Sequence, residues 1–232
     1  MNYGNGGDFE VSGELNVFKL IKNKFPQEEK LIIFDVGANV GNYSMALANF
    51  FTSSATIHSF EPSHKTFEFF MQSVRGMQNI IPNNFGLSII ENKEVLYTNS
   101  DGSGLASVYH RNLDHFGISM DIVETVNMST IDKYCRDKQI DRIHFLKLDI
   151  EGHEFKALQG AKEMIAAKKI DFIQFEFGGC NIDSRTFYQD FYYMLKDNYR
   201  FYRILKDDIV HLPVYHETYE IFITHNFLAI RQ

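Results

Sequence analysis

The sequence predicts an α/β fold built on a mostly parallel sheet with helices on both of its faces. Apolar runs of strand length alternate with segments of helical spacing, which is typical of βαβ units. The first run leads directly into a glycine-containing turn, Asp35–Gly41. Three later runs end at or beside the acidic residues Glu61, Asp149 and Glu176. Because parallel strands end at one edge of a sheet, we expect these residues to border one cleft.

Size and composition fit one domain with a large core. The chain has 232 residues, of which 44% are hydrophobic; this is enough for one α/β domain and short for two. We expect residues 31–232 to form this domain and residues 1–30 to be a helical or irregular segment that could cover the site. The net charge of −7 argues against a nucleic-acid partner, because binding phosphates requires Lys and Arg surfaces.

The sequence lacks targeting features. No apolar run approaches the roughly 20 residues of a membrane span. Met1–Glu10 is polar and glycine-rich, unlike a signal peptide. Cys135 and Cys180 have neither a metal-ligand spacing nor a disulfide framework. We therefore predict a cytoplasmic protein, and a homo-oligomer stays possible.

The first half of the sheet is predicted from three apolar runs. Leu31–Val36 is an apolar run preceded by charges, which is typical of a fully buried strand. Phe67, Phe70 and Val74 share one face of a helix. The predicted elements are strands at Leu31–Val36 and Thr56–Phe60, a strand within Asn79–Leu87, and helices at Val40–Phe51 and Ser63–Arg75.

The second half contains a long excursion between the third and fourth strands, from Ile90 to Ser129. It includes the turn cluster Asp101–Gly104, and we expect an inserted loop or small sheet with strands at Val95–Thr98 and Leu105–Tyr109. The later predicted elements are strands at Ile143–Ile150 and Ile170–Phe177, helices at Glu154–Ala167 and Phe187–Leu195, and an antiparallel pair at Arg200–Leu205 and Glu220–Ile230.

The turn after the first strand reads Gly37-x-Asn39-x-Gly41. Glycines permit a tight turn and the close approach of a ligand to the main chain. In the dinucleotide fingerprint G-x-G-x-x-G the middle glycine admits a pyrophosphate, and Asn39 stands in its place. This weighs against NAD but not against S-adenosylmethionine (SAM), which has no phosphate. The alternative is a plain strand–helix turn.

Glu61 ends the second strand, immediately before Pro62. An acidic side chain there, about 20 residues after the glycine turn, can accept hydrogen bonds from both hydroxyls of a ribose. Because SAM and NAD share this ribose, Glu61 indicates a nucleoside cofactor without choosing between them. The alternative is a solvated carboxylate at a strand end.

The fourth strand ends in the acidic segment Lys147–Glu154. We expect Asp149 and Glu151 to point into the same cleft as Gly37 and Glu61. Alternatively, Glu151 or Glu154 serves only to cap the following helix.

With these motifs in this order, the chain resembles the FkbM family of methyltransferases. The resemblance rests on four segments: Phe34–Gly41, Phe60–Pro62, Asn84–Ser88 and Leu146–Glu154. It implies a Rossmann-like class I methyltransferase fold with a mostly parallel seven-stranded sheet. It also implies SAM-dependent methyl transfer to a hydroxyl of a sugar, a glycan or a natural-product small molecule.

The resemblance also implies cofactor-binding residues by position. They are Asp35, Gly37, Ala38, Asn39 and Gly41 around the methionine part of SAM, Glu61 and Pro62 at the ribose, Asn84, Gly86 and Ser88 near the adenine, and Asp149.

Methyl transfer to a sugar hydroxyl benefits from a general base, because the hydroxyl is a weak nucleophile. We expect Asp149 or Glu151 to orient or deprotonate the acceptor, with His153 and His64 as second choices. Asp149, Glu151 and Glu176 are also oxygen ligands that could hold Mg²⁺. Nothing in their spacing requires a metal, and no metal site is predicted.

Two other function classes stay open. A nicotinamide-dependent oxidoreductase is disfavoured by the loop Gly37–Gly41. A non-catalytic binding module with this fold is disfavoured by the intact acidic strand ends. The sequence does not identify the acceptor.

Overall fold

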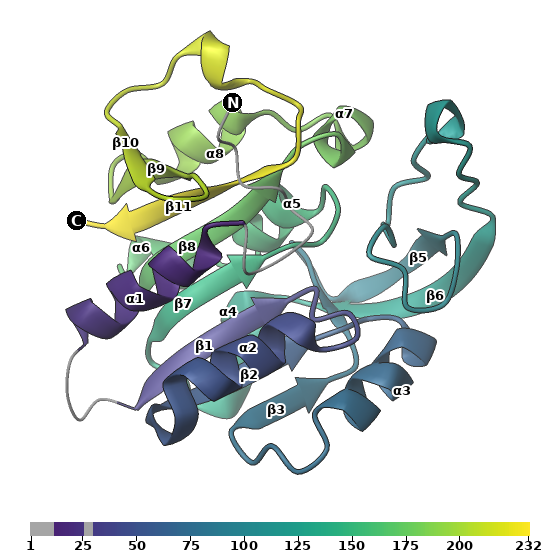
Figure 1. Ribbon diagram of the computed structural model, residues 1–232, viewed down its shortest axis with the longest axis horizontal. Helices are drawn as coiled ribbons and strands as arrows, with labels where there is room; N and C mark the ends of the chain where they lie inside the picture. Colours follow the sequence, from purple (N-terminus) through teal and green to yellow (C-terminus); the bar gives the residue numbers. More distant parts are fainter. Residues whose placement is uncertain (1–11, 26–29) are drawn as a thin grey trace.

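Eight strands form the main sheet of the computed structural model, which describes residues 12–25 and 30–232 (Figure 1). They are β1 (Leu31–Val36), β2 (Ala55–Phe60), β3 (Ile80–Asn83), β7 (Ile143–Leu148), β8 (Ile170–Phe177), β9 (Tyr199–Ile204), β10 (Ile209–Leu212) and β11 (His225–Arg231). Their order across the sheet is β10-β9-β11-β8-β7-β1-β2-β3. The strands from β3 to β8 in this order are parallel, and the pairs β8–β11, β11–β9 and β9–β10 are antiparallel.

The chain changes direction across the sheet between β1 and β7. β2 and β3 follow on one side of β1, whereas β7 and β8 follow on the other side. The connections after β1 and β7 therefore diverge, which leaves a crevice at the carboxyl ends of these two strands. This is the edge where the sequence places the acidic strand ends.

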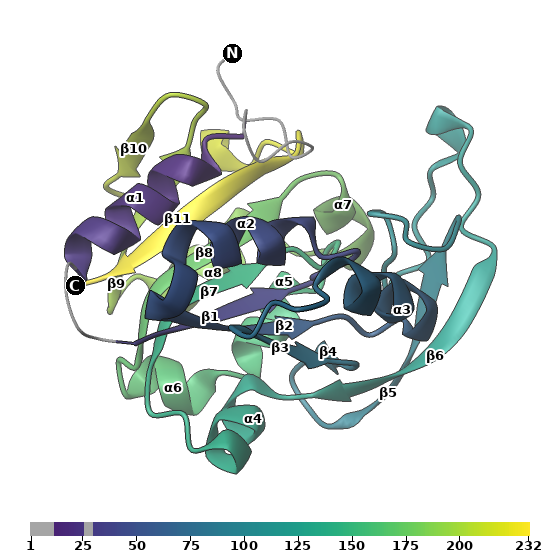
Figure 2. The same ribbon diagram turned by 60° about the horizontal axis from the view of Figure 1, so that its bottom comes forward.

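Helices cover both faces of the sheet, as predicted (Figure 2). Alternate side chains of β1 explain this, since Leu31 and Ile33 join one buried cluster and Phe34 and Val36 join the other. The helices of the first cluster are α1 (Glu14–Lys24), α2 (Asn42–Phe51) and α3 (His64–Ser73). Those of the second are α4 (Ile131–Lys138), α5 (Glu154–Gln159), α6 (Lys162–Ala166) and α8 (Tyr188–Leu195).

The sheet has one strand more than the seven predicted. The additional strand, β10, pairs antiparallel with β9 at the edge of the sheet. Of its four residues only Leu212 is buried. At four residues, Ile209–Leu212 is too short for its apolar residues to show a period by which a strand could be recognised.

The helix predicted at Glu154–Ala167 is divided into α5 and α6. Gly160 ends α5 and packs so closely on the main chain that a Cβ atom there would lie 2.0 Å from the Ser88 carbonyl oxygen. The Gly160 carbonyl also accepts a hydrogen bond from the Asp132 amide at 2.9 Å. This tertiary contact interrupts a helix that the local pattern makes continuous.

A second, three-stranded sheet projects beside the main sheet (Figure 1). It consists of β4 (Gly86–Leu87), β6 (Ile122–Ser129) and β5 (Asn92–Thr98), in that order. The strand predicted at Leu105–Tyr109 is wrong: Ser107 makes only an isolated bridge to Tyr97. The partner of β5 is instead β6, which lies at the far end of the excursion.

Part of the segment predicted at residues 1–30 is the helix α1. It buries Val17, Phe18 and Ile21 against α2 and the sheet. Residues 1–11 and 26–29 lie outside the described part of the chain. The prediction that Met1–Glu10 is not a signal peptide therefore concerns residues outside the described part. Within residues 12–25 and 30–232, no helix has the length and apolar character needed to cross a bilayer.

Candidate active site

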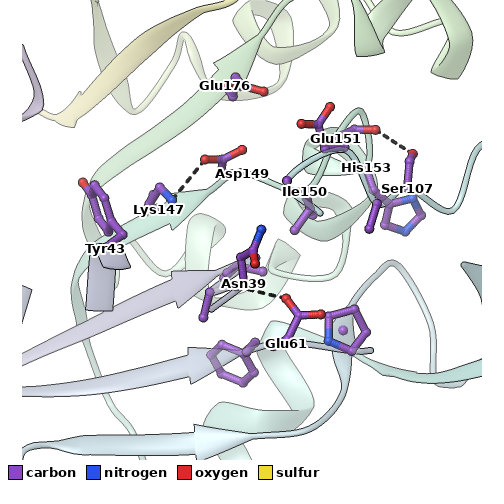
Figure 3. A pocket seen from close by; sticks show the side chains of 18 of the residues that line it. Asn39, Tyr43, Glu61, Ser107, Lys147, Asp149, Ile150, Glu151, His153 and Glu176 are labelled. Atoms are coloured by element: carbon purple, nitrogen blue, oxygen red, sulfur yellow. Dashed lines mark hydrogen bonds and ion pairs between the residues drawn. The ribbon is translucent and has the colours of Figure 1, made fainter. Parts of the chain in front are cut away.

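A cavity of about 480 Å³ opens at the crevice between β1 and β7. Residues from the ends of β1, β2, β7 and β8 line it, together with the loop 102–108 and the first residue of α1. Figure 3 shows Glu61 on one side of this space and Asp149, Glu151 and Glu176 on the other. The polar strand ends expected from the sequence therefore share one cavity.

The loop after β1 requires glycine at position 37. Its φ angle is +86°, and a Cβ atom there would lie 1.8 Å from the Asp149 carbonyl oxygen. The Gly37 and Ala38 amides both donate to the Phe60 carbonyl at 3.0 Å. The backbone after β1 is thus fixed against the ends of β2 and β7, which leaves Asn39, at φ +47°, in the cavity wall.

Glu61 is held at the end of β2 by main-chain donors. Its two carboxylate oxygens accept hydrogen bonds from the Asn39 amide at 3.0 Å and the Ser63 amide at 2.9 Å. Each oxygen keeps a further lone pair for a ligand. Burial raises the pKa of Glu61 to about 7, so donors from a ligand would favour its charged form.

Lys147 occupies the cavity wall between two carboxylates. Its ammonium lies 3.1 Å from the Asp149 carboxylate, 3.6 Å from that of Asp35, and 4.1 Å from the centre of the Tyr43 ring. Burial lowers the pKa of Lys147, but Asp149, Asp35 and Glu14 raise it by more, so the net shift is upward. This lysine therefore stays charged and fixes the position of Asp149.

Asp149 is the carboxylate most open to a ligand. Its side chain is 34% exposed, compared with 15% for Glu151. Glu151 is bound by the Arg111 guanidinium, while burial raises its pKa. Burial and the neighbouring Asp149 also raise the pKa of Glu176, to well above its usual value. Asp149 is thus better placed than Glu151 to meet an acceptor.

The group that could hold a metal ion is not the set of three carboxylates considered from the sequence. Ligand atoms of Glu151, Glu176 and Cys180 lie within 4.8 Å of one another. This group includes Cys180 in place of Asp149. Burial raises the pKa of the Cys180 thiol, which keeps it protonated unless a cation is bound.

The two histidines considered as bases are poorly suited to that role. His153 lines the cavity, but its ring nitrogens contact the Ser88 hydroxyl at 2.9 Å and the Tyr109 hydroxyl at 3.3 Å. Burial and Lys156 lower the pKa of His153 to about 4, which makes it a weak base. His64 lies outside the cavity, where it pairs with Glu124 at 2.6 Å.

Most of the expected site residues line the cavity, and four do not. Asp35 is fully buried behind Lys147 and accepts a hydrogen bond from Ser44. Gly41 begins α2. The Asn84 amide group donates to the Glu61 carbonyl and so supports the turn after β2. Ser88 lies behind His153. The cavity-lining set is Gly37, Ala38, Asn39, Glu61, Pro62, Gly86, Asp149, Glu151 and His153.

Seven polar lining residues were missed in the sequence: Glu14, Asn42, Tyr43, Ser103, Ser107, Lys147 and Asn226. Lys147 could have been recognised from the sequence as a candidate site residue, because it is a charged residue in a strand that is otherwise apolar apart from His144. Glu14 and Asn226 come from opposite ends of the chain, and no local pattern indicates that they meet.

Comparisons with known proteins identify the family and the fold. The chain matches the model of the Methyltransferase FkbM domain over residues 35–201. It is 26% identical over 165 residues to the hexuronic acid methyltransferase AglP of Haloferax volcanii. That match covers 71% of this chain and 62% of AglP, so the chain spans less than two thirds of this relative.

Two solved structures share the fold. Methyltransferase FkbM from Methylobacillus flagellatus KT has a TM-score of 0.50 at 15% identity, covering 87% of this chain and 43% of that one. The METTL16 methyltransferase domain has a TM-score of 0.51 at 9% identity, covering 95% of this chain and 68% of that one. The predicted methyltransferase fold is confirmed, with eight strands in its main sheet.

Proposed function

We propose, because the chain belongs to the family of FkbM-domain methyltransferases, that it transfers a methyl group from SAM to a hydroxyl oxygen. The acceptor that we propose is a sugar or glycan, or else a natural-product alcohol. The observation that carries the cofactor assignment is Glu61, a buried carboxylate held by two main-chain amides beside the Gly37 turn. This arrangement suits a ribose with two neighbouring hydroxyls.

The loop after β1 supports SAM over a dinucleotide. A pyrophosphate needs free amides and glycine at the closest approach. Here the Gly37 and Ala38 amides are already used by the Phe60 carbonyl, and the Asn39 side chain occupies the cavity wall. A sulfonium cofactor has no phosphate and needs neither feature.

When bound, SAM would supply an activated methyl group for an in-line displacement. The acceptor oxygen would form a bond to the methyl carbon as the carbon–sulfur bond breaks, and the electron pair of that bond would stay on sulfur. Asp149 accepts the hydroxyl proton, because its carboxylate is held by Lys147 at 3.1 Å and still faces the cavity.

A sugar acceptor is supported by the relative AglP, which is described as a hexuronic acid methyltransferase. Transfer of methyl-labelled SAM to a panel of sugars, nucleotide sugars, hexuronic acids and polyketide-like alcohols tests the proposal. We expect the label in a methyl ether of one acceptor class. If SAM binds but no member of the panel is labelled, the proposed acceptor classes are wrong.

A further inference from the structure

One part of the cavity wall brings together both signs of charge and an amide. Glu14 comes from α1, Lys147 from β7 and Asn226 from β11, and all three line the cavity. They are 7%, 4% and 8% exposed, respectively. The Gln174 side chain connects two of them, since its amide nitrogen donates to Glu14 and, at 3.5 Å, to Asn226.

These groups retain hydrogen-bonding capacity that the protein does not use. The Lys147 ammonium has three N–H groups; its neighbours are the Asp149 and Asp35 carboxylates and the face of the Tyr43 ring, whose centre lies 4.1 Å away. Within residues 12–25 and 30–232, the Asn226 side-chain nitrogen donates no hydrogen bond. The Glu14 oxygens each accept one hydrogen bond, from Gln174 and from Ser12, and keep further lone pairs. Unused buried polar capacity is costly unless a ligand satisfies it.

The chemistry of this wall matches an α-amino acid. A zwitterion needs an anionic acceptor for its ammonium and cationic or amide donors for its carboxylate, placed close together. We propose that Glu14, Lys147 and Asn226 form the subsite for the methionine end of SAM. Glu14 accepts from the α-ammonium, and Lys147 and Asn226 donate to the α-carboxylate. This inference rests on the proposed function and assigns the residues that recognise the amino-acid part of the cofactor.

The assignment makes α1 part of the cofactor site. Glu14 is the first residue of that helix, and Gly13 before it packs so tightly that a Cβ atom would lie 2.0 Å from the Leu205 carbonyl oxygen. Burial raises the pKa of Glu14, and Lys147 opposes that rise. A ligand ammonium beside Glu14 would favour the charged carboxylate further.

Two ligands that differ in the amino-acid part test the subsite. S-adenosylhomocysteine has the full tail, whereas 5′-methylthioadenosine keeps the adenosine and sulfur without it. A hydrogen bond to a charged group contributes about 1.5–3 kcal/mol, which is roughly a tenfold or larger change in affinity. In calorimetry we expect Glu14→Gln and Lys147→Met each to lower the affinity for S-adenosylhomocysteine about tenfold or more. The affinity for methylthioadenosine should stay unchanged.

Two control variants separate this inference from the proposed function. Glu61→Gln should lower the affinity for both ligands, because both contain the ribose. Glu68→Gln, at an exposed carboxylate outside the cavity, should weaken neither. If Glu14→Gln and Lys147→Met weaken both ligands equally, or neither, the subsite is wrong while the cofactor site stands. If the wild-type protein binds neither ligand, the proposed function itself fails.

A test on the wild-type protein does not depend on the variants folding. Decarboxylated SAM keeps the sulfonium and the ammonium but lacks the α-carboxylate. We expect it to bind about tenfold or more weakly than SAM, because Lys147 and Asn226 lose their partner. Equal affinities would overturn the assignment of these two residues.

Discussion

At the scale of single residues, the site depends on where carboxylates are held and what holds them. Glu61 is fixed by main-chain amides, Asp149 by the Lys147 ammonium and Glu151 by the Arg111 guanidinium. These different partners give three acidic side chains three different capacities to accept a proton or a hydrogen bond. In the proposed reaction Glu61 binds the ribose and Asp149 meets the acceptor, whereas Glu151 stays in its ion pair with Arg111.

The pKa of Glu61, raised by burial to about 7, predicts a pH dependence of cofactor binding. We expect ribose hydroxyls to donate to the charged carboxylate, so SAM should bind the deprotonated protein more tightly. Affinity should be constant above that pKa and should fall as the pH drops through it, by up to about tenfold per pH unit. Calorimetry between pH 5.5 and 8.5 measures this slope.

Glu61→Gln provides the reference for that measurement. The amide cannot titrate, so the variant should bind SAM more weakly and lose this part of the pH dependence. A wild-type slope that persists unchanged in the variant would assign the titration to another group.

Replacing Asp149 by Asn should separate catalysis from cofactor binding. The amide is nearly isosteric but cannot accept the hydroxyl proton, so we expect kcat to fall by about 10²–10⁴-fold. The affinity for S-adenosylhomocysteine should change little. Steady-state transfer of labelled methyl at saturating SAM and acceptor measures kcat, and Asp141→Asn, at a side chain that is 97% exposed, is the control. Near-normal turnover of Asp149→Asn would remove Asp149 from the mechanism.

At the scale of elements, the sequence predicts the position of a residue when that position depends only on the strand or turn that contains it. Glu61 and Asp149 could be placed because parallel strands end at one edge, whatever the rest of the chain does. The break between α5 and α6 could not, since it depends on the contact of Gly160 with Ser88, remote in the chain. The positions of Glu14 and Asn226 depend on the strand order β11-β8-β7 and on the packing of α1 against the sheet. No local sequence pattern predicts either of these.

The turn after β1 allows a matched test of that local rule. Gly37 and Gly76 have similar φ angles, +86° and +89°, but only Gly37 is packed against another main-chain segment. Gly76→Ala should lower the free energy of unfolding by about 1 kcal/mol, which is the penalty for a Cβ atom at a positive φ angle. Gly37→Ala should cost several times more, because the Asp149 carbonyl must move. Denaturant unfolding of both variants measures the difference, and equal losses would mean that the close approach is unimportant.

At the scale of the whole molecule, α1 connects the sheet to the site. Phe18 is fully buried and contacts the rings of Tyr43, Phe50 and Phe145. Phe18→Ala should lower the free energy of unfolding by about 3–5 kcal/mol. Because Glu14 lies on the same helix, SAM affinity should fall with it. Unchanged stability in denaturant unfolding would mean that α1 is not part of the cooperative core.

The central claim is that the cavity between β1 and β7 holds SAM. Calorimetric titration of the purified protein with SAM, S-adenosylhomocysteine and NAD tests it most directly. We predict saturable binding of SAM and of S-adenosylhomocysteine, weakened in Glu61→Gln, and no binding of NAD. Tight binding of NAD, with no heat from either of the other two ligands, would contradict the account.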